Sequence, residues 1–295
     1  MQKVVDFIHV GYHKTGSTWL QLVGFQKHPE IELINKPGSN IEKFFYDNFW
    51  RADDFDFNPK KFRQAFSKLI ETSFTFNQAQ VRGISEENLT GHVYTGQNAK
   101  VLADRIYETF GKVKVIIVVR NQIGMITSLY NNYIQHGGSL SLSAFCKDLN
   151  IPGWLIFRKL QYDKLIQYYF NLFGKEQVKV MLYEEMSQDL DKFMNDMFSF
   201  IGVKPYSFKN WNCKINPALS PVSLRLARFA NAIFAKKVKI FHLGLRLFDE
   251  WIYYKIGRET SATRLALELS DQFRESNRRL EKLLDRELGI YGYPV

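Results

Sequence analysis

The stretch VVDFIHVGYHKTGSTW, residues 4–19, decides the fold of this chain. Its first part, VVDFIHV (4–10), is short, apolar and rich in β-branched residues, as is typical of a strand buried in a parallel sheet. Its second part, GYHKTGSTW (11–19), holds two glycines at the spacing G-x-x-x-x-G, with hydroxyl side chains before a predicted helix. A strand that passes through such a turn into a helix is typical of loops that bind phosphate groups.

The lysine of this loop does not stand where an ordinary P-loop has it. The P-loop signature places Lys directly after the second glycine, but here Ser17 follows Gly16, and Lys14 lies inside the loop. The apolar run VKVIIVVR (113–120) ends in Arg120, where a nucleotide hydrolase has an aspartate that holds Mg²⁺. The sequence therefore predicts direct binding of a multiply charged anion, without a metal.

Four short apolar runs alternate with helical stretches along the first two thirds of the chain. The predicted strands are 4–10, 81–85, 113–120 and 177–184, and the predicted helices are 17–27, 59–78, 97–110, 121–135, 154–173 and one that ends near Ile201. This alternation predicts an α/β fold, P-loop-like, with three layers and a central parallel sheet flanked by helices. We expect one domain over 1–295, with a cofactor-binding core at 1–205 and a mostly helical acceptor-side cap at 206–295.

The composition of the chain indicates the kind of partner that it binds and the cellular compartment in which it works. The chain has 295 residues and a net charge of +10, which favours an anionic partner. Its two cysteines, Cys146 and Cys213, form no disulfide framework and indicate a reducing compartment. The N-terminal residues lack the apolar core of a signal peptide, and we find no run long enough to span a membrane. We therefore predict a cytoplasmic protein.

A second anion-binding group follows the strand 113–120. Arg120 lies at the carboxyl end of this strand, where α/β folds place their ligands. Asn121 is expected to cap the next helix, and Gly124 and Ser128 lie at successive turns of one face of it. Because glycine leaves that face open, we expect Arg120 and Ser128 to grip a second phosphate.

The two motifs together resemble a known family. HKTGSTWL (13–20), followed about 100 residues later by VVRNQIGMITSLY (118–130), resembles the sulfotransferases that use 3′-phosphoadenosine 5′-phosphosulfate (PAPS). In that family the first motif binds the 5′-phosphosulfate and the second binds the 3′-phosphate. The residues that match are Lys14, Thr15, Gly16, Thr18, Trp19, Arg120 and Ser128. The stretches 83–91, 172–186 and 274–295 look like the bacterial carbohydrate- or glycolipid-type members.

The resemblance implies roles for the loop residues. Lys14 is expected to stabilise the bridging oxygen of PAPS, leaving 3′-phosphoadenosine 5′-phosphate (PAP) as product without help from a metal. The expected cofactor contacts in the loop are His13, Lys14, Thr15, Gly16, Ser17, Thr18 and Trp19. His13 is considered for the sulfonate and Trp19 for the adenine, although Trp19 equally suits the core. The late Arg-Lys-Gly run of the small-molecule members is missing here. The candidates to replace it are Lys214, Asn216 and Arg225.

The acceptor hydroxyl needs a base within hydrogen-bond reach. Glu87, in GISEENLTG (83–91), is the first candidate because this segment leaves a predicted strand toward the cofactor. Glu86 stands beside it, and one glutamate of such a pair often serves as the N-terminal charge of a helix. His92 and His136 are the remaining candidates.

The composition of residues 222–258 indicates the kind of acceptor. This stretch holds eight basic and two acidic residues, interleaved with aromatic ones. Such a pattern suits a membrane surface, and hence a carbohydrate or glycolipid acceptor at the inner face of the membrane; it suits a helical cap with a solvated basic face equally well. We expect no nucleic-acid partner, and the sequence makes no prediction of oligomeric state.

The predicted activity is metal-independent transfer of a sulfuryl group from PAPS to a carbohydrate hydroxyl. A P-loop nucleotide kinase or hydrolase is the alternative enzyme, and it requires Mg²⁺ and ATP. A module that binds anionic glycan or membrane without turnover is the third reading.

Overall fold

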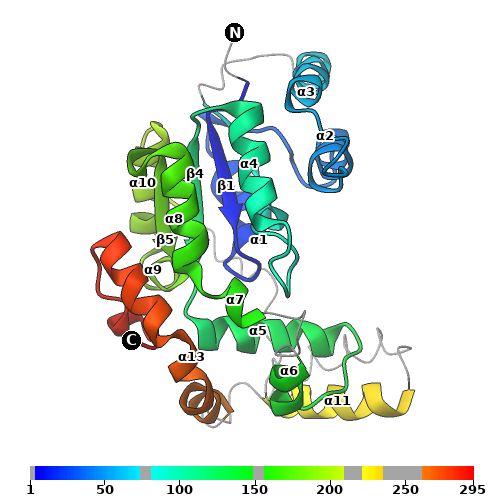
Figure 1. The fold of residues 1–295 in the computed structure, drawn as a ribbon, viewed down its shortest axis with the longest axis vertical. Coiled ribbons are helices and arrows are strands. Elements are labelled where there is room, and N and C mark those ends of the chain that lie inside the picture. Colours follow the sequence, from blue (N-terminus) through cyan, green and yellow to red (C-terminus); the bar gives the residue numbers. More distant parts are fainter. Residues whose placement is uncertain (1–3, 74–80, 149–155, 209–220, 235–260) are drawn as a thin grey trace. The chain divides into compact units, whose positions relative to one another are not determined.

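A computed structural model (Figure 1) describes residues 4–73, 81–148, 156–208, 221–234 and 261–295. Its centre is a five-stranded parallel sheet in the order β2-β3-β1-β4-β5. The strands are β1 (Phe7–Gly11), β2 (Ile31–Leu33), β3 (Val81–Ser85), β4 (Lys114–Val119) and β5 (Val178–Leu182). Helices α4 and α8 pack side by side against the sheet (Figure 1). The predicted α/β fold with a central parallel sheet is confirmed, and the strand missing from the prediction is β2.

The helical elements follow the predicted pattern with a few differences. They are α1 (Ser17–Trp19), η1 (Leu20–Phe25), α2 (Asn40–Phe45), η2 (Tyr46–Trp50), α3 (Pro59–Ser73), η3 (Glu87–Thr90), α4 (Ala99–Phe110), α5 (Gln122–Gln135), α6 (Leu142–Asp148), α7 (Ile156–Lys159), α8 (Tyr162–Phe173), η4 (Lys175–Gln177), α9 (Tyr183–Gln188), α10 (Leu190–Ile201), α11 (Pro221–Phe234), α13 (Ser261–Leu284) and η5 (Gly289–Tyr291). The helix after β1 continues as the π-helix η1, and the stretch predicted at 154–173 contains the two helices α7 and α8. Among the described helices, none has both the length and the apolar character that crossing a membrane requires.

The chain divides into two compact units. The first combines residues 1–120 and 161–213 and contains the whole sheet. The second combines 121–160 and 214–295, so the segment 121–160 belongs with the C-terminal helices and not with the predicted core of 1–205. Within the second unit, the buried side chains of Gln122 and Asn277 exchange two hydrogen bonds, of 2.7 and 3.1 Å, which join α5 to α13. Asn231 of α11 donates to the carbonyl oxygen of Ile134 at the end of α5.

Strand β1 lies between β3 and β4 and is buried along its whole length. Alternate side chains of a strand point to opposite faces of the sheet, and Phe7 and His9 share one face. The ring centroid of Phe25, from η1, lies 5.2 Å from that of Phe7 and 5.8 Å from that of His9. The π-helix therefore packs on this face of β1, and the loop that joins them is held at both ends.

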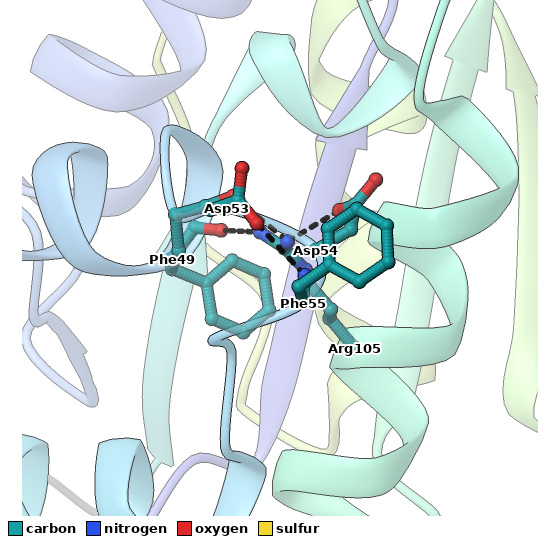
Figure 2. Close-up of polar contacts among 6 residues, drawn as sticks. Phe49, Asp53, Asp54, Phe55 and Arg105 are labelled. Carbon is teal, nitrogen blue, oxygen red and sulfur yellow. Dashed lines mark hydrogen bonds and ion pairs between the residues drawn. The ribbon is translucent and has the colours of Figure 1, made fainter.

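Helices α2 and η2, which we call the 40–50 segment, pack through phenylalanines. The rings of Phe45 and Phe49 stack with their centroids 4.6 Å apart, and Phe62 of α3 lies 5.0 Å from Phe49. The loop after the 40–50 segment is held by Arg105 of α4, as Figure 2 shows. The Arg105 side chain is only 5% exposed and donates to the carbonyl oxygens of Phe49 and Ala52 and to the carboxylate of Asp54.

Candidate active site

The loop after β1 has the backbone of an anion-binding turn. Lys14 and Gly16 both adopt positive φ, of 68° and 84°, and Gly16 directly precedes α1. The Thr15 hydroxyl donates to the carbonyl oxygen of Tyr12, a bond of 2.5 Å that closes the turn. Because the first N–H groups of a helix have no partner within the helix, this turn directs them, together with the positive end of the helix dipole, at a ligand.

Ser17 offers a hydroxyl to that ligand. Its side chain is buried, and its Oγ has no hydrogen-bond partner among the described residues. A Cβ atom added at Gly11 would lie 2.6 Å from this oxygen, so a larger residue at position 11 would displace it. A buried hydroxyl without a partner is costly, and an oxygen of a phosphate group would satisfy it. The donor set of the loop thus fits the 5′-phosphosulfate expected from the sequence.

Thr18 and Trp19 follow Ser17 on α1 and differ in their surroundings. Thr18 is half-buried, whereas Trp19 is 7% exposed and its ring meets that of Phe208 edge-on, with centroids 5.3 Å apart. The structure therefore shows for Trp19 the core packing that the sequence left open. Its contact with adenine stays a prediction.

Arg120 projects from the carboxyl end of β4 onto the loop. Its Nη1 donates to the backbone carbonyl of Lys14 over 3.1 Å, and its guanidinium lies 4.5 Å from the ring centroid of Tyr183. The Tyr162 hydroxyl donates to the carbonyl oxygen of Arg120 over 2.7 Å and fixes the backbone there. The first motif and the arginine of the second thus meet at one place, as the sequence predicts.

Electrostatics join Lys14, Glu87 and Arg120. Burial lowers the pKa of Lys14 below its ordinary value, the carboxylate of Glu87 raises this pKa, and the positive charge of Arg120 lowers it. A hydrogen bond thus joins Lys14 to Arg120, and an electrostatic interaction joins Lys14 to Glu87. The catalytic and phosphate-binding roles of these residues stay predictions.

The two neighbouring glutamates have different positions. Glu86 is 7% exposed and caps η3, because its Oε1 accepts from the backbone N–H and the side-chain amide of Asn88, over 3.0 and 2.8 Å. Burial raises the pKa of Glu86. Glu87 is half-buried and interacts with Lys14. The helix-cap role weighed for this pair thus belongs to Glu86, and the role of Glu87 as the base stays a prediction.

A buried polar network fixes the turn that carries Glu87. Its centre is Ser85, at the end of β3: the Ser85 hydroxyl lies 2.7 Å from Nδ1 of His9, and Asn35 pairs with the backbone N–H and carbonyl of Ser85 over 3.0 and 2.9 Å. Gln21 of η1 also donates to the Ser85 carbonyl, over 3.0 Å. Desolvation lowers the pKa of the buried His9 to about 3, so this imidazole is neutral at physiological pH. The network ties the turn to β1 and η1.

A pocket of about 370 Å³ opens beside this turn and the loop. Residues from three separate parts of the first unit line it: His13, Gln21, Glu42, Lys43, Tyr46, Glu86, Glu87 and Asn88. The Trp50 indole donates to the carbonyl oxygen of Asn88 over 3.0 Å, which links the 40–50 segment to the turn of Glu87. His13 and the predicted base Glu87 thus line the same pocket. The contact of His13 with the sulfonate stays a prediction.

The other predicted residues lie elsewhere. His92 is exposed and its Nδ1 contacts the hydroxyl of Thr95 over 3.2 Å; His136 is exposed at the end of α5, with Nδ1 2.7 Å from the Asn132 carbonyl oxygen. Each imidazole thus makes a polar contact with a residue of its own turn. Ser128 is half-buried on α5 of the second unit, and its contact with the 3′-phosphate stays a prediction.

Some predictions concern residues outside the described ranges. These are Lys214 and Asn216, and the part of the 222–258 stretch from 235 onward. The third candidate substitute for the missing motif, Arg225, lies exposed on α11.

The sequence reasoning missed two groups of residues at the site. Tyr183 and Met186 of α9 pack against Gly16, where an added Cβ would lie 3.5 Å from the Tyr183 ring and 3.2 Å from the Met186 sulfur. Their position after β5, at the same sheet edge as Arg120, could have suggested them. The 40–50 segment was also missed, although Ser39 is a typical N-cap residue: the Glu42 N–H donates to the Ser39 hydroxyl over 3.1 Å.

Comparison with known proteins agrees with this geometry. The sequence profile of the sulfotransferase domain matches residues 5–212, more than two thirds of the chain. The solved sulfotransferase from Alicyclobacillus acidocaldarius has a similar fold, with a TM-score of 0.60 and 20% identity over 98% of both chains.

Two further solved structures resemble the chain less. The mouse sulfotransferase SULT7A1 complexed with PAP has a TM-score of 0.41 and 19% identity over 69% of this chain and 60% of that one. The sulfotransferase domain from the curacin biosynthetic pathway gives 0.46 and 14%, over 91% and 98%. A comparison with curated protein sequences found no match. With its fold, its anion loop and the matched profile taken together, the chain belongs to the sulfotransferase domain family and is an enzyme of sulfuryl transfer.

Proposed function

We propose that this enzyme transfers the sulfuryl group of PAPS to a hydroxyl of a carbohydrate acceptor. The observation that carries the proposal is the meeting of Lys14, Arg120 and Glu87 around one loop. A lysine and an arginine supply positive charge to the donor, and a carboxylate next to them can take a proton. A pocket beside the carboxylate leaves space for the acceptor.

The loop holds the donor by its 5′-phosphosulfate. The backbone N–H groups at the start of α1 and the hydroxyls of Ser17 and Thr18 donate to the phosphate oxygens. Lys14 itself adopts positive φ in this loop, and the charges of Glu87 and Arg120 act on its ammonium group. Arg120 braces this arrangement through its bond to the Lys14 carbonyl and supplies charge toward the 3′-phosphate.

Transfer is an in-line displacement. The acceptor oxygen forms a bond to the sulfur atom, the bond from sulfur to the bridging oxygen breaks, and PAP leaves with the electron pair. Negative charge grows on the bridging oxygen, and the Lys14 ammonium group stabilises it where it develops. Glu87 accepts the proton of the acceptor hydroxyl. The protein thus catalyses the transfer by positioning the reactants and by stabilising the charge that develops.

The exposed side chains of α11 support a glycolipid at the inner face of the membrane as the acceptor. Leu226 and Phe229, one helical turn apart, are 44% and 67% exposed, and Arg225 lies exposed beside them. A helix face that combines apolar and basic side chains suits an anionic lipid surface. We propose that this face brings the enzyme to the membrane.

A binding titration separates this function from that of a kinase. PAP should raise the melting temperature of the protein without Mg²⁺, and ATP with Mg²⁺ should raise it less. Transfer of sulfate from PAPS to an extract of surface glycans and lipids, followed by mass spectrometry, should then be lost in Lys14→Ala, with the melting temperature of the variant retained. A preference for ATP with Mg²⁺ would contradict the proposal, and so would normal transfer by Lys14→Ala.

A further inference from the structure

The pocket beside Glu87 has an unusual charge for a protein with a net charge of +10. Three carboxylates, those of Glu42, Glu86 and Glu87, line it, against the single ammonium group of Lys43. Lys43 is exposed, so solvent screens its charge more than that of the partly or fully buried carboxylates. The volume of about 370 Å³ lies near the lower end of small-molecule sites. Because the charge of Lys14 acts on Glu87, the excess negative charge of the pocket is that of Glu42 and Glu86.

Two of these carboxylates are fixed by the fold. Glu42 accepts from the backbone N–H of Gly38 over 2.6 Å with one oxygen, and its second oxygen has no hydrogen-bond partner among the described residues. Glu86 likewise uses Oε1 for Asn88, and its Oε2 has no such partner in the described parts of the chain. Each side chain is thus held in place while one of its oxygens is left to accept a hydrogen bond from a ligand.

The two carboxylates also act on each other. Burial is the main cause of the raised pKa of Glu86, the hydrogen bonds from Asn88 oppose it, and the negative charge of Glu42 adds a small further increase. A further negative charge in the pocket would add to this repulsion, whereas hydroxyl or ammonium donors would relieve it. Like-charge repulsion of this kind is a common means of rejecting the wrong partner.

We infer, on the basis of the proposed function, that the pocket receives its acceptor as an uncharged or amine-bearing polyol. Acceptor groups that carry a carboxylate or a sulfate are excluded, and Glu42 and Glu86 determine this specificity. The enzyme thus places the first sulfate on a neutral or amino sugar and does not extend a glycan that is already acidic at this position.

A matched series of acceptors tests the inference. We would supply PAPS with methyl β-glucuronamide, methyl β-glucosaminide or methyl β-glucuronide and measure kcat/KM for sulfate transfer. The glucuronamide and the glucuronide both lack the 6-hydroxyl and differ in the charge of one group. The glucuronamide and the glucosaminide should exceed the glucuronide at least about tenfold, the size expected for one partly screened like-charge contact. Glu42→Gln keeps an acceptor for Gly38 and should reduce this ratio. Lys43→Gln, its neighbour, should increase it.

The outcomes separate the inference from the proposed function. Equal transfer to the glucuronide, or an unchanged ratio in both variants, overturns the inference while leaving sulfuryl transfer intact. Transfer to none of the three by an enzyme that still binds PAP also overturns it, because the pocket then takes no simple polyol. Failure to bind PAP or PAPS at all would instead contradict the proposed function.

Discussion

The guanidinium group of Arg120 donates a hydrogen bond to the backbone carbonyl of Lys14, so the ends of two neighbouring strands are locked together at the anion loop. These residues are separated by more than 100 positions in the sequence, and β1 and β4 pair in parallel register up to this point. The arginine therefore has two tasks. It supplies charge to the ligand, and it holds the loop in the shape that presents Lys14.

Arg120→Met should weaken PAP binding by about 10- to 100-fold, the equivalent of one charge-assisted hydrogen bond. Lys112→Met is the matched control, since this exposed lysine precedes the amino end of β4 and its loss changes the net charge equally. Isothermal titration of both variants with PAP measures the effect. Similar affinities in the two variants would show that Arg120 acts only through net charge.

Glu87→Gln should lower kcat by about 10²- to 10⁴-fold, because the acceptor proton loses its base. Glu86→Gln should lower it less than about tenfold, since glutamine still accepts the two hydrogen bonds of Asn88. Steady-state rates of sulfate transfer compare the neighbours. The reverse order would move the base to Glu86.

The charge of Lys14 should make PAP binding sensitive to alkaline pH. Burial lowers the pKa of Lys14 below its ordinary value of 10.5, so the protonated form that binds the anion is lost at a lower pH than for an exposed lysine. Glu87 raises this pKa and Arg120 lowers it. Glu87→Gln should thus shift the alkaline loss of affinity to lower pH, and Arg120→Met should shift it to higher pH. Titrations across the pH range reveal both directions.

His9 should make the fold sensitive to acid. Its pKa falls from 6.5 in the unfolded chain to about 3 in the native protein. The unfolded chain therefore binds a proton that the native state does not, and stability decreases as the pH falls from 6.5 toward 3. The loss is about 1.4 kcal/mol per pH unit for one such group. His9→Asn retains a partner for Ser85, and urea unfolding at several pH values should show a shallower acid decline. Parallel curves for the two proteins would rule out this role.

Arg105→Met should lower the free energy of unfolding by about 2–4 kcal/mol, because the carbonyl oxygens of Phe49 and Ala52 lose their donor. Asp54→Asn should cost less than about 1 kcal/mol, since the Asp54 side chain is 54% exposed and screened. Chemical denaturation measures both. Equal losses would show that the ion pair, and not the two carbonyl bonds, holds this loop.

Local pattern predicted much of the fold and of the donor site. Strand β4 is a run of apolar residues after Lys114, and β1, β3 and β5 are mostly apolar with one or two polar residues each. Such runs are recognisable because strands inside a parallel sheet are covered on both faces. β2 has only three residues, which is too short for a periodic signal. The anion loop and Arg120 were found because each lies directly beside one of the clear strands.

The acceptor side was harder to predict, because it depends on contacts between distant segments. Glu86 and Glu87 are adjacent in sequence and chemically identical, and only the bonds of Asn88 distinguish the cap from the candidate base. The 40–50 segment reaches this turn through the bond from Trp50 to Asn88. Neither relationship leaves a local signature in the sequence.

The strand order has a consequence for biosynthesis. β1 is made first but finds its partners only when residues 81–85 and 114–119 have emerged from the ribosome. Until then this largely apolar segment is exposed in the nascent chain, where it can aggregate or bind chaperones. The nucleotide site is accordingly a late product of folding, and a truncated N-terminal fragment that carries the whole loop would have no means of shaping it.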